Sequence, residues 1–194
     1  IARAEMTYQK AKGLGLLSGC DHSVVVPSPA TRAQLERFHT PAYLDELEHA
    51  SRGDLSPAGL HMGLGTADNP IFPDMLKIGQ AAAGAVLHGA QMLLDGEAQR
   101  VFSPLGGFHH AMRDHAGGFC YINDIVLGAL CLADAGKRVL ILDIDAHHGD
   151  GMQAAFYDRA DIMTISLHES GKYIFPETGF ENEMDFREGL KETI

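Results

Sequence analysis

The sequence predicts an α/β fold, a doubly wound three-layer sandwich built around a central parallel sheet. Two stretches rich in leucine and β-branched residues, 139–144 and 162–167, are typical of buried parallel strands. Helical patterns alternate with such stretches through short links, as a parallel sheet requires. The 194 residues are 45% hydrophobic and 21% charged, which is enough apolar material for the core of one domain.

The first half of the chain is predicted to be mainly helical. The expected helices span residues 2–12, 29–38, 41–50 and 74–94. Thr40 and Pro41 mark the clearest start, a threonine N-cap followed by proline at the first helical position. A short strand is expected at 24–26, and 51–73 is expected to be a long loop of the kind that is commonly functional. His39 is predicted to be a hydrogen-bonding structural histidine rather than a metal ligand.

The second half is predicted to alternate strands, loops and helices. Strands are expected at 100–103, 139–144 and 162–167, and helices at 123–135 and 153–157. Asn123 is the expected cap of the first of these helices. Gly106 and Gly107 precede two adjacent histidines, His109 and His110. Because glycines let the backbone take unusual angles, both histidines can face one site from this loop.

A cluster of acids and histidines follows the strand at 139–144. Asp143 and Asp145 share one face of it, and moving each carboxylate out of water costs several kcal/mol unless a cation or hydrogen bonds compensate. His147, His148 and Asp150 follow at once. Acids that face solvent and cap the next helix are the simpler alternative, but three acids and two histidines exceed any capping need. The stretch therefore predicts a metal site at the carboxyl end of a central strand.

Composition excludes several classes of protein. The net charge of −11 argues against a nucleic-acid binder, which needs clustered lysine and arginine. Cys20, Cys120 and Cys131 are widely spaced, which indicates a reducing compartment and argues against a disulfide framework or a cysteine-rich zinc site. No apolar run is long enough for a membrane span. We expect a cytoplasmic protein, and a first residue other than methionine suggests a sequence that begins inside a longer chain.

Four motifs together resemble the histone deacetylase family, most closely its bacterial deacetylase-like and acetoin-utilisation branches. They are Gly106–Ala111, Gly118–Asp124, Asp143–Gly151 and Ser166–His168, in the family's order. The resemblance covers the chain from about residue 35 to residue 180 and implies the arginase/deacetylase-like fold. It also implies a zinc amidohydrolase, with iron as an alternative metal and potassium as a structural ion, that removes acyl groups from lysine-like amines.

The resemblance assigns residues to the metal site and to the catalysis. It makes Asp145 and His147 zinc ligands. It places two histidines over the bound water and orients each with an acid: His109 with Asp143, and His110 with Asp150. The chemistry is consistent with these roles, because a divalent metal lowers the pKa of bound water from about 15.7 toward roughly 7. A histidine can then take the proton of that water and later protonate the leaving amine.

The resemblance further implies a substrate tunnel and two potassium sites. Phe119 and Phe175 would wall the acyl-lysine tunnel, Gly118 would let the backbone approach the substrate, and Asp68 would be the rim acid that holds the substrate backbone. The residues that match one potassium site are Asp143, Asp145, His147, Ser166 and Leu167. Those that match part of a second are Phe156 and Ile162.

Two parts that the family needs have no match in these 194 residues. They are the third zinc ligand, an aspartate on a later strand, and the tyrosine that stabilises the oxyanion. The tail 180–194 is acidic and helix-like, whereas the family has a glycine-rich turn and a strand there. We expect one deacetylase-like catalytic domain over 1–194 that lacks its C-terminal part. With only two protein ligands, we expect the zinc to be held weakly by this chain alone.

Three alternatives remain open at this point. An arginase-like ureohydrolase shares the Asp145-Ala-His147 element but expects an acid where this chain has Gly149. A non-catalytic binding module could keep the pocket without the chemistry, although the intact histidine pair argues against it. Within the deacetylase reading, the partner could be an acetylated lysine of a peptide or protein, or an acetylated small amine such as a polyamine. Composition and motifs leave the oligomeric state open.

Overall fold

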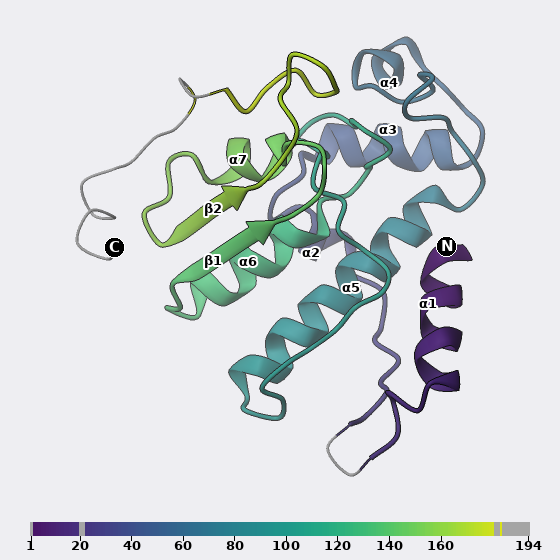
Figure 1. The fold of residues 1–194 in the computed structure, drawn as a ribbon. Helices are drawn as coiled ribbons and strands as arrows, with labels where there is room; N and C mark the ends of the chain where they lie inside the picture. Colours follow the sequence, from purple (N-terminus) through teal and green to yellow (C-terminus); the bar gives the residue numbers. More distant parts are fainter. Residues whose placement is uncertain (1, 20–21, 181–182, 184–194) are drawn as a thin grey trace.

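The computed structural model describes residues 2–19, 22–180 and 183 of the chain (Figure 1). Its elements in order are α1 (Ala2–Gly13), α2 (Arg32–Leu35), α3 (Pro41–Ser51), α4 (Pro57–His61), α5 (Met75–Leu94), α6 (Asp124–Asp134), β1 (Val139–Asp143), α7 (Asp150–Phe156) and β2 (Ile162–Ser166). The helix-like tail expected after Phe180 lies outside the described residues, apart from residue 183.

The two strands confirm the expected parallel pairing. Val139 pairs with Ile162 at the start of the strands, and Asp143 pairs with Ser166 at their ends. Helix α7 connects the two strands. Helix α6 contacts β1 and α7 contacts β2, and Figure 1 shows both helices behind the strands. Because the strands are parallel, their carboxyl ends lie side by side, and the loops that follow them meet there.

Helices cover one face of this sheet. Val139 and Ile141 point to that face and pack with a buried cluster from α6, α7 and β2: Val126, Ala129, Ala133, Met152, Phe156 and Ile162. Leu140, Leu142 and Ile144 point to the opposite face and are 61%, 58% and 76% exposed. The expectation of a strand buried on both faces is therefore wrong for the described residues. Their helices pack on one face of the two strands, so only alternate side chains of β1 are covered.

A second cluster joins the helical half of the chain to α6. The apolar stripe of α3, with Tyr43, Leu44 and Leu47, is fully buried and packs with residues of α5 and α6. The segment after residue 27 crosses α5 closely, because a Cβ on Gly84 would lie 2.2 Å from the carbonyl oxygen of Ser28. The small residues of α5 therefore allow the close packing that the sequence suggested.

Several helix ends were predicted correctly. The side chain of Thr40 accepts the N–H of Tyr43, and Pro41 is the first residue of α3. The side chain of Asn123 accepts the N–H of Val126 and caps α6. None of the helices in the described part of the chain is long and apolar enough to span a membrane.

Other elements differ from the prediction. The helix expected at 29–38 is reduced to α2, because Thr31 forms a capping box and starts the helix later. The loop expected at 51–73 contains α4, which Ser56 caps. Helix α7 begins at Asp150, three residues before the expected start. Residues 24–26 and 100–103 form no strand, since neither pairs with another strand among the described residues.

Candidate active site

The candidate site lies at the carboxyl ends of β1 and β2. Three loops meet there: 104–118, which carries the paired histidines; 144–149, between β1 and α7; and 167–179, after β2. Asp143 is the last residue of β1 and Asp150 the first of α7, so the sheet and the helix place these two acids directly.

His109 is held by the acid at the end of β1. Its Nδ1 lies 2.6 Å from Oδ2 of Asp143, and its Nε2 lies 3.9 Å from Oδ1 of Asp145. Burial of His109 disfavours its positive charge, but the hydrogen bond and the charge of Asp143 outweigh burial and raise the pKa of the imidazole. Burial acts to raise the pKa of Asp143 as well, yet hydrogen bonds from His109 and from the N–H of Asp145 lower it.

His110 forms the second pair. Its Nδ1 lies 2.7 Å from Oδ1 of Asp150, and its side chain is 4% exposed. The rings of His109 and His110 lie 3.9 Å apart between centroids. In both histidines Nδ1 is hydrogen-bonded to a carboxylate, so Nε2 remains available to exchange a proton with a bound molecule. The structure brings each histidine into contact with the acid that the resemblance paired with it.

Asp145 and His147 are the two residues proposed to bind zinc. Nδ1 of His147 lies 3.0 Å from Oδ1 of Asp145, so the two side chains bond each other beside the acid–histidine pairs. Burial acts to raise the pKa of Asp145, but the N–H and the ring of His147 outweigh it and lower this pKa. A carboxylate oxygen and an imidazole nitrogen are ligands that zinc takes. They fit a metal by type but not by number, because no group of three or more such side chains occurs among the described residues.

Residues at the start of α6 bind the histidine loop, the loop 104–118 that carries His109 and His110. The buried carboxylate of Asp124 accepts the N–H groups of Gly107 and Phe108 at 3.0 and 2.9 Å. The Nδ2 group of Asn123 donates to the backbone oxygens of His109 and Ala111. Burial raises the pKa of Asp124, and the two N–H donors compensate only in part. The sequence identified Asn123 only as a helix cap and gave Asp124 no role.

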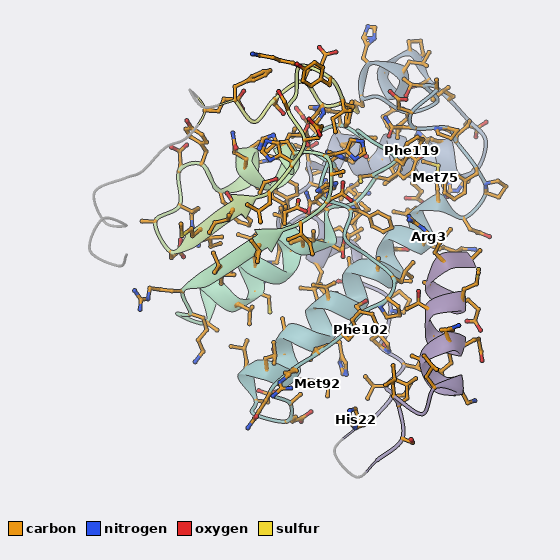
Figure 2. The ribbon with its side chains drawn as sticks, in the orientation of Figure 1. Arg3, His22, Met75, Met92, Phe102 and Phe119 are labelled. Carbon is orange, nitrogen blue, oxygen red and sulfur yellow. The ribbon has the colours of Figure 1, made fainter. Side chains whose placement is uncertain are left out.

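Two of the expected tunnel residues pack against His110. The ring of Phe175 lies 4.9 Å from that of His110 in an edge-to-face arrangement. A Cβ on Gly118 would lie 2.4 Å from Cδ2 of His110 and 2.8 Å from Cε1 of Phe175, so only glycine fits there. Phe119 is 66% exposed, and Figure 2 labels it near the end of α5 where Met75 lies. Gly118 therefore lies close to the rings of His110 and Phe175, which contact each other.

The expected rim acid, Asp68, is exposed in the loop before α5. Its neighbour Asn69 is buried, and its Oδ1 accepts the N–H of Phe119 at 2.9 Å. This contact joins the loop of Asp68 to the loop of Gly118 and Phe119. No motif in the sequence indicated a function for Asn69. Its position beside Asp68 in a long loop was the only available signal.

The residues matched to a first potassium site meet where the strands end. Asp143 pairs with Ser166, and the N–H of Leu167 donates to the backbone oxygen of Asp143 at 2.9 Å. Asp145 and His147 follow in the adjacent loop. The two residues matched to a second site, Phe156 and Ile162, are buried in the cluster beneath the sheet.

A second histidine pair lies behind the site and was missed. The rings of His148 and His168 are 4.6 Å apart. His148 is buried between Thr178 Oγ1 at 2.8 Å and Gln153 Oε1 at 2.9 Å, and burial lowers its pKa. His168 bonds the hydroxyl of Ser166 and the backbone oxygen of Gly179. These bonds fix both ends of the loop that carries Phe175.

Comparison with known proteins assigns the chain to a family. Residues 1–194 match the histone deacetylase domain. The chain belongs to the histone deacetylase family. It is 39% identical to histone deacetylase 8 of Xenopus tropicalis over 189 residues, which cover 96% of this chain and 50% of that protein. It is 37% identical over 179 residues to the acetoin utilization protein AcuC of Bacillus subtilis, covering 91% and 46%.

Solved structures of deacetylase relatives share its fold. A histone deacetylase homologue from Aquifex aeolicus superposes with a TM-score of 0.85 at 35% identity, over 97% of this chain and 50% of that one. A deacetylase homologue complexed with SAHA gives the same values. The HD domain of HDA15 gives a TM-score of 0.82 at 28% identity, over 96% and 53%. The arginase/deacetylase-like α/β fold is thus confirmed, and the chain spans about half the length of the relatives it matches.

Proposed function

We propose that this chain contributes the proton-transfer residues of a metal-dependent deacetylase, which removes acetyl or other acyl groups from lysine side chains or related amines. One observation carries the proposal. Two adjacent buried histidines each bond a separate carboxylate through Nδ1, and their rings lie 3.9 Å apart beside Asp145 and His147. A core histidine needs no carboxylate of its own, whereas two such pairs beside metal-type donors suit hydrolysis of an amide.

Asp145 and His147 would hold zinc, with iron as the alternative. The ion would supply a water whose pKa is lowered from about 15.7 toward roughly 7 and would polarise the substrate carbonyl. Two donors are fewer than a catalytic zinc site uses, so the proposal requires a further ligand from outside the described residues. The donor that stabilises the oxyanion is likewise expected outside them.

The histidine pair would carry the proton. With Nδ1 fixed by its acid, a neutral imidazole accepts a proton from water at Nε2, while the neighbouring ring stabilises the developing charge. The water oxygen bonds to the acyl carbon, the C–N bond breaks, and the imidazole gives its proton to the leaving amine nitrogen. The products are a carboxylic acid and a free amine. Proton transfer of this kind is worth about 10²–10⁴ in rate.

The surrounding residues suit a long alkyl side chain. Phe119 and Phe175 would wall its path, and Gly118 would leave room for it beside His110. Asp68, exposed in the loop next to Phe119, would accept N–H groups of the substrate backbone at the entrance. Aromatic walls gain free energy by covering methylene groups and keep water away from the reacting carbonyl.

Potassium is proposed as a structural ion at two places. At the first, Asp143, Ser166 and Leu167 bring oxygen atoms together at the ends of both strands, next to Asp145 and His147. Phe156 and Ile162 would offer backbone oxygens to a second. An ion at the first place would offset the repulsion between the carboxylates of Asp143 and Asp145.

Metal content and turnover test the proposal together. The protein as the cell produces it should contain one zinc or iron per chain by elemental mass spectrometry and should release acetate from an acetyl-lysine peptide. We expect His110→Ala to lower kcat by about 10²–10⁴ with the metal retained. Asp145→Ala should lose the metal. Full metal content in Asp145→Ala would show that the ligand assignment is wrong.

The choice of substrate separates the alternatives. An acetylated polyamine tested beside the acetyl-lysine peptide distinguishes a small-amide hydrolase from a protein deacetylase by the ratio of kcat/KM. Release of urea from arginine, with two manganese ions bound, would instead favour a ureohydrolase. A metal-loaded protein that hydrolyses none of the three would contradict the proposal and leave a binding module.

A further inference from the structure

The loop of Asp68 and the loop of Phe119 are joined by one side chain. Oδ1 of Asn69 accepts the backbone N–H of Phe119 at 2.9 Å, across 50 positions of sequence. Asn69 is only 4% exposed, although the residues on both sides of it are exposed. Thr66 Oγ1 accepts its backbone N–H at 3.1 Å, and its own carbonyl accepts the N–H of Gly65 at 2.8 Å. These two hydrogen bonds hold the backbone of Asn69 in place, which positions its Oδ1 to accept the N–H of Phe119.

The residue that Asn69 holds has an unfavourable backbone. Phe119 has φ +65° and follows Gly118 at φ +49°. Gly117 and Cys120 exchange backbone hydrogen bonds of 3.1 and 2.7 Å across them, which makes a tight turn with both central residues left-handed. Glycine, asparagine and aspartate usually occupy such positions. Phenylalanine populates the left-handed conformation less than negative-φ conformations by a factor of roughly 5–30. Other contacts must therefore hold Phe119 in it.

The strained turn presents an apolar ring to solvent. Phe119 is 66% exposed, so little of the residue is buried to offset the cost of its backbone conformation. A Cβ on its neighbour Gly118 would collide with His110 and Phe175, so the turn lies close to the histidine pair. The buried thiol of Cys120 supports the turn by donating to the oxygen of Gly118 at 3.3 Å. Strained residues that persist next to a reactive group are commonly functional.

We propose that Asn69 is a positioning residue, which keeps Phe119 in the left-handed conformation so that its ring stands as a wall of the acyl-lysine path. The inference rests on the proposed function for what the wall contacts. Without the Asn69 oxygen, the N–H of Phe119 loses its acceptor and the turn relaxes toward negative φ. The ring then leaves its place, and substrate binding weakens while the histidine pair and its acids stay intact.

The same two segments offer a matched control. Tyr121 donates its hydroxyl to the backbone oxygen of Pro70 at 2.6 Å and so also ties the Asn69 segment to the turn segment. Tyr121→Phe removes that bond without touching the N–H of Phe119. Asn69→Asp keeps an acceptor oxygen at the same place, whereas Asn69→Ala removes it. The three variants separate the acceptor at Phe119 from mere attachment of one loop to the other.

Kinetics and binding test the proposal in the protein as the cell produces it. Asn69→Ala should raise KM for an acetyl-lysine peptide about tenfold and weaken binding of SAHA by a similar factor, as loss of one hydrogen bond allows. Its kcat should stay within about threefold, with metal content unchanged. Asn69→Asp should restore KM to within about threefold. Tyr121→Phe should match the unmodified protein in KM.

The outcomes are distinct from those of the proposed function. If the unmodified protein deacetylates no peptide, the proposed function fails, and the φ angle of Phe119 in a crystal structure of Asn69→Ala still tests the inference. A φ that stays near +65° in that variant would overturn it. Equal losses in Asn69→Ala and Tyr121→Phe would also overturn it, because simple loop attachment would then explain both. A KM effect rescued by Asn69→Asp supports it.

Discussion

Acid should destabilise this protein through His39, which is buried without a charged partner. The side chain is 1% exposed, and its Nε2 accepts the backbone N–H of Asn123 at 3.0 Å. Its Nδ1 lies near the backbone carbonyls of Met112 and Arg113 without a hydrogen bond of good geometry. Burial therefore dominates and lowers the pKa of His39 to about 4. Protonation of Nε2 would also remove the acceptor for Asn123.

The sign and size of the effect follow from the two pKa values. An unfolded histidine titrates near 6.5, so below that pH the unfolded chain binds a proton that the folded protein refuses. The free energy of unfolding is unaffected by His39 above pH 6.5 and falls by about 1.4 kcal/mol per pH unit below it. The loss ends near pH 4, where the folded protein takes up the proton as well. It amounts to about 3 kcal/mol, a large share of typical stability.

Urea unfolding followed by circular dichroism measures this loss. We compare the unmodified protein with His39→Gln at pH 7.5 and 5.0, at constant ionic strength. Glutamine offers an oxygen to Asn123 and does not titrate, so the unmodified protein should lose about 2 kcal/mol more than the variant. His88→Gln, at an exposed position of α5, controls for removal of a histidine and should behave like the unmodified protein. Equal losses in His39→Gln and the unmodified protein would refute the reasoning.

Two further predictions concern packing. Gly84→Ala places a Cβ 2.2 Å from the oxygen of Ser28, which is backbone and cannot yield, so thermal melting should show a loss of about 1–3 kcal/mol. Gly13→Ala meets nothing within 4 Å and should change stability by less than about 0.5 kcal/mol; equal effects would contradict the packing. Tyr43→Phe removes a 2.8 Å bond from a buried hydroxyl to the backbone oxygen of Tyr121, for an expected loss of about 1–2 kcal/mol in urea unfolding. An unchanged midpoint would mean that this bond contributes nothing.

Elements with local signals were predictable from the sequence. Thr40 and Pro41 define the start of α3 through contacts within one turn, and Asn123 does the same for α6. The predictions of strands at 24–26 and 100–103 were wrong, because a segment becomes a strand only when another strand pairs with it. The prediction that β1 is buried on both faces failed for a related reason, since burial depends on which elements cover each face. Neither property is contained in the segment itself.

The acid–histidine pairs were predictable for a different reason. Asp143 and His109 are 34 positions apart, and only the resemblance to a family connected them. Where the resemblance gave no role, contacts across long separations were missed. Asn69 meets Phe119 through a backbone N–H, which any residue would supply. His148 looked like part of the metal motif, yet it bonds Thr178, a residue that carried no signal.

The start of α6 limits how the site can be changed by evolution or by design. Asn123 caps the helix with its oxygen and holds the histidine loop with its nitrogen, and Asp124 beside it binds two further N–H groups of that loop. A substitution there would therefore disturb both the start of the helix and the placement of the histidine loop. Asp68, Phe119 and Phe175 neither cap a helix nor hold the histidine loop, and all three are exposed. We therefore expect substitutions to be tolerated more readily at these exposed residues than at the start of α6.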